Sequence, residues 1–482
     1  MNVRGSAPPV PPGRRPLGPL TPVDAPAAAP SKAPAGGGGF RLGGSTLPVP
    51  KPTLYEWPFI FVLGYLFVDY GRPHNWVPAL GLIRPGVIVL GGGILSLMSR
   101  RVLPASHILA KYMLWFAALM AVMVPFSVNS RMAFNGTRDF WLFLFGACFP
   151  IIAFVDTYER LLKALKFWVY IHVPLGIYSI THRGVGVGSF LTDENDFALA
   201  LNVILPYAFA MAFMAKKLVS KMVLFGVVLL LVAASTATLS RGGFLGLVCV
   251  FGMLWLKSPK KLVSAALVGV LCLAMLVVTP ASYWKEMKTI ETAEDEGDTG
   301  FERLYLWGIA WKMWLDHPIF GVGPNNYPYN NQNYENPERV AKGRHVWGMA
   351  SHSLYFTVLP ELGLVGTILF FSMIATSWIE RRRIARRCRN ALAADGLSDE
   401  NRDRLQTLLQ LCAAMDVALL TFLVTGAFIA VLYYPHIWLL LAFTAALDKV
   451  SRRVLPEPVE AKAGPSFRPM VASPALAGRP LR

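Results

Sequence analysis

Charged residues are scarce in this chain of 482 residues. Asp, Glu, Lys and Arg make up 16% of it, whereas hydrophobic residues make up 54%. A soluble globular domain typically has about 25% charged residues, so the composition argues against that class. Apolar runs of about 20 residues recur, each long enough to cross a bilayer as a helix. The short alternating segments of a transmembrane barrel are absent from the sequence. We therefore expect an all-α polytopic membrane protein.

Cysteine is rare as well. The chain has five cysteines, four in apolar runs and one in a basic segment. No two of them have the spacing of a metal site, and they form no disulfide framework. They are Cys148, Cys249, Cys272, Cys388 and Cys412.

The two ends of the chain differ from its apolar middle. Residues 1–52 are rich in Pro, Ala and Gly and lack the apolar stretch of a signal peptide. We expect a disordered basic tail there, and a second one over residues 451–482. The formal net charge of +17 raises the possibility of nucleic acid as a partner. We expect no nucleic acid, because the cations lie in the tails and in short connections.

Hydropathy predicts about twelve membrane-spanning helices within a transmembrane domain over residues 53–450. The predicted segments are 54–70, 77–98, 107–126, 138–156, 160–180, 196–215, 218–235, 240–257, 261–279, 352–378, 405–425 and 427–447.

Alternate connections between these segments are rich in Lys and Arg. The densest is the loop "RRRIARRCR" over residues 381–389. Basic loops tend to stay in the cytoplasm, which predicts that both termini are cytoplasmic. The opposite side then has "THRGVGVGSFLTDEN" (181–195), "LSRGGFLGL" (239–247) and one large loop over residues 280–351. Long loops of this kind are usually functional.

The large loop has three recognisable parts. "ETAEDEGD" (291–298) is either a solvated acidic turn or a calcium site, although its spacing does not fit an EF-hand. "FERLYLWGIAWKMWLD" (301–316) is aromatic and too short to span, which favours a helix at the membrane interface. It should end near Asp316 or His317, because Pro318 follows. The Gly-x-Gly of "HPIFGVGPNNY" lacks the context of a phosphate loop, so a helix stop is the better interpretation.

Three polar residues fall near the membrane surface on the predicted outer side. Arg241 begins a span, Arg303 begins the aromatic helix, and His352 begins the tenth span. Either arginine alone could extend towards lipid headgroups, and a lone interfacial histidine is more often structural. Together, two fixed cations and one titratable base form a candidate anion site, since guanidinium groups bind phosphate oxygens in pairs.

At these residues the sequence resembles the superfamily of O-antigen ligases and Wzy-type O-antigen polymerases. The resemblance rests on "LSRGGFLGL", "ERLYLWGIAWKMWLDHPIFGVGPNNY" and "ASHSLYFTVLPELGLVG", in that order, within residues 218–379. "TDENDFALALNVILP" (192–206) is similar to an upstream feature of the family. Many members have Asn where this chain has Ser353, a departure that concerns the sub-family.

The resemblance implies a GT-C type membrane glycosyltransferase in the bacterial inner membrane, with its active site in the periplasm. Such enzymes transfer a glycan from undecaprenyl diphosphate to an acceptor hydroxyl, with inversion and without an obligatory metal or other cofactor. Arg241 and Arg303 match the diphosphate-binding arginines of the family, and His352 matches its essential histidine.

Several points stay open at this stage. Arg183, Asp316 and His317 are secondary candidates for substrate binding, with helix capping as the alternative for the last two. The acceptor could be the lipid A core, another lipid-linked glycan, an exopolysaccharide chain or a protein hydroxyl. These acceptors correspond to a ligase, a polymerase and a protein O-oligosaccharyltransferase.

A small-anion transporter is the rival class, because ionisable groups within spans often mark transport pathways. Asp416 and His436 lie equally far from Gly426, so a hairpin turning there would bring them together near mid-bilayer. Such a pair would be either structural or a proton relay, and we expect His172 to be a lone core histidine. The sequence shows no obvious internal repeat of the transporter type.

Overall fold

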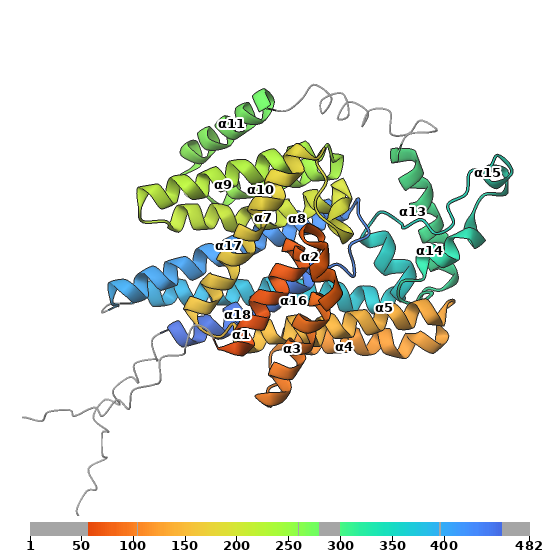
Figure 1. The fold of residues 1–482 in the computed structure, drawn as a ribbon, viewed down its shortest axis with the longest axis horizontal. Helices are drawn as coiled ribbons and strands as arrows, with labels where there is room; N and C mark the ends of the chain where they lie inside the picture. Colours follow the sequence, from red (N-terminus) through yellow and green to blue (C-terminus); the bar gives the residue numbers. More distant parts are fainter. Residues whose placement is uncertain (1–55, 104, 259, 279–298, 395–396, 456–482) are drawn as a thin grey trace, which may run out of the picture. The chain divides into compact units, whose positions relative to one another are not determined.

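The computed structural model describes residues 56–103, 105–258, 260–278, 299–394 and 397–455, and every regular element within these ranges is a helix (Figure 1). All of these helices belong to one unit, residues 52–482. The predicted N-terminal tail, most of the predicted C-terminal tail and the acidic segment 291–298 lie outside the described residues.

Six helices among the described residues are long and apolar enough to cross a membrane. They are Ile108–Phe126 (α4 and η3), Ser130–Phe154 (α5, η4 and α6), α8 (Glu194–Met214), α9 (Leu218–Ala237), α16 (Tyr355–Leu392) and α17 (Asp399–Gly426). Two shorter apolar helices are Trp57–Gly71 (α1 and η1) and α3 (Pro85–Ser99). The chain is therefore a multi-pass membrane protein, and the count of twelve spans stays a prediction.

The remaining helices complete the set. They are α2 (Pro73–Trp76), η2 (Pro78–Ile83), α7 (Tyr158–Thr181), η5 (Ser189–Thr192), α10 (Arg241–Lys257), α11 (Lys261–Val278), α13 (Thr299–Asp316), α14 (Tyr327–Asn330), η7 (Asn331–Tyr334), α15 (Pro337–Ala341) and α18 (Pro435–Val454). The end of α13 at Asp316 agrees with the stop predicted from the following proline.

Each predicted span overlaps a helix, and two of the boundary differences occur at prolines. Segment 77–98 is a long helix only from Pro85, because Arg84 has a left-handed backbone with φ 48°. Segment 427–447 becomes helical only at Pro435, the first residue of α18. A proline fits the first turn of a helix, where its missing N–H would have no partner in any case.

The predicted basic loop over residues 381–389 is wrong, because α16 continues as a helix to Leu392. Its Arg, Ala and Ile residues are compatible with a helix, and the run has no Gly or Pro. Arg381 is 1% exposed, so one face of this stretch packs against the protein, whereas Arg382, Arg383, Arg386 and Arg389 are exposed.

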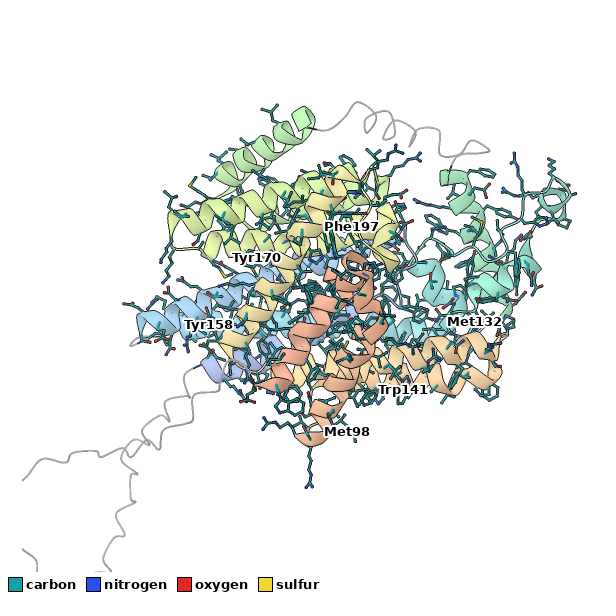
Figure 2. The ribbon with its side chains drawn as sticks, viewed as in Figure 1. Met98, Met132, Trp141, Tyr158, Tyr170 and Phe197 are labelled. Carbon is teal, nitrogen blue, oxygen red and sulfur yellow. The ribbon has the colours of Figure 1, made fainter. Side chains whose placement is uncertain are left out.

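Helix α8 lies at the centre of the packing and contacts α7, α9, α10 and α17. A buried polar group, Asn202, ties three of these helices together. Its amide donates to the Gly243 carbonyl at 2.8 Å, and its oxygen accepts from the Ser235 hydroxyl at 2.9 Å. A Cβ added at Gly243 would lie 2.6 Å from Ala198, so glycine is what allows α10 to approach α8 this closely. Phe197, fully buried near the start of α8, is labelled in Figure 2.

The basic connections gather at one end of the helices. Ion pairs join the end of α8 to the start of α17 (Lys216–Asp403) and the start of α17 to the start of α7 (Arg404–Glu159). In Figure 2 the label of Tyr158, on α7, marks this end, and the label of Met132, on α5, marks the other end. We call the first the basic end. The opposite end has segments 182–196, 238–243, 351–354 and 427–434.

The predicted approach of Asp416 to His436 is wrong. The carboxylate of Asp416 instead accepts from Arg381 Nε at 2.8 Å and from Lys257 Nζ at 2.9 Å. His436 is the second residue of α18, because residues 427–434 form an irregular connection rather than a tight turn at Gly426. A charge within apolar helices is stabilised by opposite charges, and the arginine and lysine supply them.

His172 is not a lone histidine, contrary to expectation. The ring of Tyr70 lies 5.2 Å from the ring of His172 and 5.4 Å from that of His436. All three side chains are fully buried. The two histidines therefore both pack against the same tyrosine.

Candidate active site

Segments from distant parts of the sequence meet at the end opposite the basic end. They are 182–196, 238–243, the start of α13 and 351–354. Three of them contain a non-glycine residue in the left-handed region: Arg183 (φ 57°), Leu239 (φ 54°) and His352 (φ 49°). Such conformations are costly and persist where the surrounding structure holds them, often at functional sites.

Arg241 is the first residue of α10, and its position is fixed by the preceding serine. The Ser240 hydroxyl caps the helix by accepting from the Gly243 N–H at 2.9 Å. The same hydroxyl donates to Asn195 Oδ1 at 2.7 Å. The cap therefore joins the start of α10 to the segment that begins α8, and Arg241 lies half-buried at this junction.

His352 is held by contacts of its neighbours on both sides. The Ser351 carbonyl accepts from the Trp307 indole at 3.0 Å, which joins this segment to α13. The Leu354 N–H donates to the Gly426 carbonyl at 2.7 Å, which joins it to the end of α17. These contacts hold the backbone beside His352, which is itself in a left-handed conformation, and the imidazole is half-buried.

Two charged residues act on His352 from different segments. Burial and the Arg303 guanidinium lower the pKa of the His352 imidazole, while the Asp193 carboxylate opposes this shift. The histidine is therefore neutral near pH 7 and able to accept a proton. Arg303 and His352 are 49 positions apart in the sequence, and folding brings Arg303 and Asp193 close enough to act on the imidazole.

Aromatic packing connects this group to Arg241. The Trp307 ring stacks on Phe356 with centroids 5.2 Å apart and lies 6.4 Å from Phe428. Phe428 in turn covers Gly242, where an added Cβ would meet it at 3.5 Å. A continuous set of contacts thus runs from the start of α10 through Phe428 and Trp307 to the backbone beside His352.

Of the secondary candidates, Asp316 and His317 lie away from this group. Asp316 is at the far end of α13, about 20 Å from Arg303 at 1.5 Å per residue. It lies beside Tyr334, and burial together with this carboxylate raises the pKa of the Tyr334 phenol to about 12. His317 is exposed and continues the helix end, with its N–H on the Met313 carbonyl at 3.1 Å. Arg183 is exposed beside segment 238–243.

The Gly-x-Gly turn docks onto a break in α16. Gly363 has φ 61° and ψ −164°, which interrupts the helix. The Val322 and Gly323 N–H groups donate to the carbonyls of Pro360 and Glu361, each at 2.9 Å. The Leu364 N–H returns a hydrogen bond to the Pro318 carbonyl at 2.8 Å. These hydrogen bonds hold residues 318–323 against residues 360–364, a contact that we call the joint. The sequence predicted only a helix stop here.

Glu361 locks this joint, and the sequence did not single it out. Its side chain is 2% exposed and accepts from the Asn325 N–H at 2.9 Å, the Tyr327 N–H at 3.1 Å and the Tyr433 hydroxyl at 2.6 Å. The Tyr327 hydroxyl donates to the Leu306 carbonyl at 2.8 Å, which ties the turn back to α13. The joint thereby positions the helix that bears Arg303. The sequence signals were a glutamate within an apolar run and its place in the motif "ASHSLYFTVLPELGLVG", but neither assigned it a role.

Asp193 was also missed, although its signal was present. Its carboxylate caps α8 by accepting from the N–H groups of Asn195 at 2.8 Å and Asp196 at 3.2 Å. An Asp just before an apolar helix is the usual pattern of such a cap. That this cap also faces His352 depends on folding and could not be read from the pattern. Among the described residues, no three side chains of the metal-ligating types are grouped as a metal site requires.

Comparison with known proteins places these residues in one domain. Residues 225–371 match the family model described as O-Antigen ligase, a range that contains Arg241, Arg303, His352 and Glu361. No curated protein matches the chain. This match, over part of the chain, supports the resemblance to the O-antigen ligase and Wzy-type polymerase superfamily.

Proposed function

We propose that the protein transfers a glycan from undecaprenyl diphosphate to an acceptor hydroxyl at the periplasmic face of the bacterial inner membrane. The observation that carries this proposal is the position of Arg303 beside a half-buried His352, within the O-antigen ligase domain. A fixed cation and a neutral base are the two groups that such a transfer requires. Their location opposite the basic end supports a periplasmic site.

The arginines stabilise the leaving group. As the bond between the anomeric carbon and the diphosphate oxygen breaks, negative charge grows on the diphosphate. Arg241 and Arg303 offer guanidinium groups that bind phosphate oxygens in pairs. Both are half-buried, so their attraction to the diphosphate is stronger than it would be in water. Lipid diphosphate is already a good leaving group, so no nucleotide and no metal is needed.

His352 acts as the general base that accepts the proton of the acceptor hydroxyl. The acceptor oxygen forms the new bond to the anomeric carbon, its proton passes to the neutral imidazole, and undecaprenyl diphosphate leaves with the electron pair of the broken bond. Attack opposite the leaving group inverts the anomeric centre. The lowered pKa keeps the imidazole neutral, and Asp193 stabilises the imidazolium that forms.

Replacing His352 with alanine should lower glycan transfer by about 10²–10⁴-fold, the usual contribution of a general base. The measurement is transfer from a polyprenyl-diphosphate-linked glycan in liposomes containing the purified protein. His345→Ala is the matched control, because His345 is exposed and pairs with Glu335 at 3.6 Å. Equal transfer by the two variants would contradict the assignment. Uptake of a small anion without any glycan transfer would favour a transporter instead.

Replacing Asp193 with asparagine should move the acid limb of the pH–rate profile to lower pH. Asp193 raises the pKa of His352, so its removal lets the imidazole stay neutral at more acidic pH. Asparagine still caps a helix, so α8 should remain intact. The measurement is kcat/KM against pH. Glu194→Gln, which removes the neighbouring exposed carboxylate, should leave the limb in place, and a shift to higher pH in Asp193→Asn would reject the pairing.

The acceptor can be identified by deleting the gene and analysing surface glycans. Loss of capped lipopolysaccharide would indicate a ligase that uses the lipid A core. Accumulation of short lipid-linked or secreted repeats would indicate a polymerase of lipopolysaccharide or exopolysaccharide. Unmodified secreted proteins would indicate a protein O-oligosaccharyltransferase.

A further inference from the structure

A cavity of about 570 Å³ opens between α8, α9, α10, α11 and α17 at the basic end. Its lining is mostly apolar. Phe209, Phe251 and Ala414 form a buried floor, and the exposed Phe213 and Trp255 stand at its edge. A cavity of this size and character suits hydrocarbon chains better than a polar metabolite.

The charged side chains of the lining are all cationic. They are Lys221, Lys257 and Lys260, and no carboxylate lines this cavity among the described residues. Lys257 Nζ pairs with Asp416, but the same carboxylate also accepts from Arg381. One negative charge thus faces two positive ones, and the local balance stays positive even before the other two lysines are counted.

The cavity lies where apolar helices end. Lys257 is the last residue of α10, Lys221 is in the first turn of α9, and Lys260 precedes α11. Trp255 is 41% exposed and Phe213 is 54% exposed, as is common for rings at the boundary between hydrocarbon and water. An apolar floor below a cationic rim at such a boundary matches a ligand that has hydrocarbon chains and an anionic headgroup.

We propose that this cavity binds an anionic phospholipid of the membrane, with its headgroup phosphate on the lysines and its acyl chains against the aromatic floor. A zwitterionic lipid would leave the excess positive charge uncompensated. Free phosphate would gain nothing from the apolar walls. The charge and the apolar surface together therefore select an anionic lipid.

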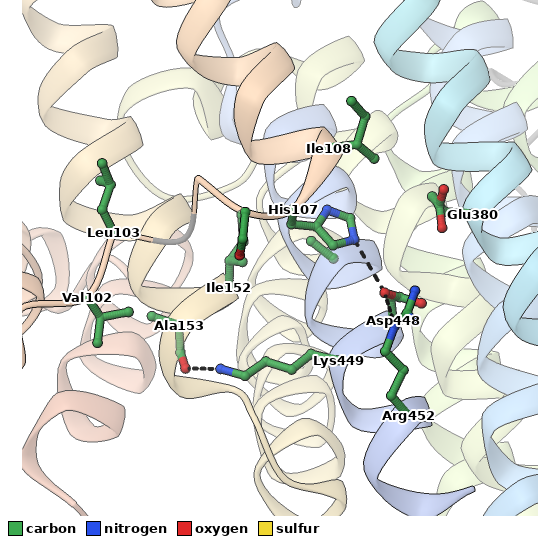
Figure 3. A pocket seen from close by; sticks show the side chains of 12 residues that line it. Val102, Leu103, His107, Ile108, Ile152, Ala153, Glu380, Asp448, Lys449 and Arg452 are labelled. Carbon is green, nitrogen blue, oxygen red and sulfur yellow. Dashed lines mark hydrogen bonds and ion pairs between the residues drawn. The ribbon is translucent and has the colours of Figure 1, made fainter. Parts of the chain in front are cut away.

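A second cavity at the basic end serves as a comparison, because its cationic side chains already have partners. It has a volume of about 460 Å³ and contains His107, Asp448 and Arg452 (Figure 3). His107 Nε2 lies 3.7 Å from Asp448, and Arg452 Nε donates to the same carboxylate at 2.9 Å. The ammonium of Lys449 donates to the Ala153 carbonyl at 2.8 Å. These cations already have partners, so this cavity offers a lipid phosphate little.

Native mass spectrometry of the purified full chain tests the proposal. The probes are phosphatidylglycerol and cardiolipin as anionic lipids, phosphatidylcholine as a zwitterionic lipid, and inorganic phosphate. The double variant Lys221→Gln with Lys260→Gln should weaken binding of the anionic lipids by about 25-fold, since each lysine near a headgroup contributes about five-fold. Phosphatidylcholine should bind weakly to both proteins.

The double variant Lys216→Gln with Lys217→Gln is the matched control. It removes the same amount of charge at the basic end, from the α8–α9 connection, but neither lysine lines the cavity. Its lipid binding should equal that of the unchanged protein. Equal losses in the two double variants would show general surface attraction, and displacement of the lipid by inorganic phosphate would show a free-phosphate site. Either result, or equal retention of phosphatidylcholine, would overturn the proposal. The readout does not involve glycan transfer, so it stands or falls separately from the proposed function.

Discussion

Replacing Arg303 with alanine should lower glycan transfer by about 10²–10³-fold while the protein stays folded in the membrane. The guanidinium is proposed to neutralise the diphosphate as it leaves, and loss of one such group typically costs this much in rate. Its removal also withdraws the positive charge that lowers the pKa of His352, so more of the imidazole becomes protonated at pH 7. Both effects slow the same step. The measurement is transfer in liposomes at saturating donor.

The substitution Arg303→Lys separates charge from geometry. Lysine keeps the charge beside His352 but lacks the planar fork that binds two phosphate oxygens. We expect a smaller but clear loss of rate, with the pH dependence of the unchanged protein retained. Lys312→Ala is the control, because it removes an exposed cation from the same helix. Near-normal transfer by Arg303→Ala would reject the diphosphate role.

Replacing Gly363 with alanine should destabilise the protein by about 3 kcal/mol or more and abolish transfer. The residue has φ 61°, and an added Cβ would lie 2.3 Å from the Ile319 carbonyl oxygen. Strain in the backbone and overpacking each cost about 1–3 kcal/mol. The joint between the Gly-x-Gly turn and α16 would open, and α13 would lose its anchor. Thermal unfolding in detergent and transfer in liposomes measure the two effects.

Gly343→Ala is the matched control for this substitution. Gly343 has φ 73°, so alanine is strained there too, but an added Cβ meets nothing within 4 Å. The Gly343→Ala variant should lose only the stability that backbone strain costs, and its glycan transfer should persist. If the two variants unfold at the same temperature, close packing of Gly363 against the turn is not what holds the joint.

Helix positions followed from the sequence because apolar runs of sufficient length have few alternatives. The start of α10 at Arg241 and the end of α13 at Asp316 agree with expectation, since a capping serine and a following proline act locally. The basic run at residues 381–389 was misassigned because charge was taken to mean a loop. Its arginines are helix formers, and buried Arg381 finds Asp416 on another helix.

Contacts between side chains from distant segments were harder to predict from the sequence. The hairpin argument placed Asp416 beside His436 by assuming a symmetric turn, but the irregular residues 427–434 shift the start of α18. Glu361 was visible as a carboxylate in an apolar run, yet its partners come from the Gly-x-Gly turn and from Tyr433. No local pattern specifies which backbone N–H groups a buried carboxylate will accept from.

The sequence by itself indicated a helical membrane protein, a resemblance to O-antigen ligases within residues 218–379, and Arg241, Arg303 and His352 as candidate reactive groups. These conclusions depend on composition, length and motif order, which are properties of the chain. The tertiary structure alone decided that Asp193 faces His352, that Glu361 holds the turn against α16, and that Lys221, Lys257 and Lys260 share one cavity. The reason is physical: such contacts join residues far apart in sequence, and only packing of the helices sets the distances between their charges.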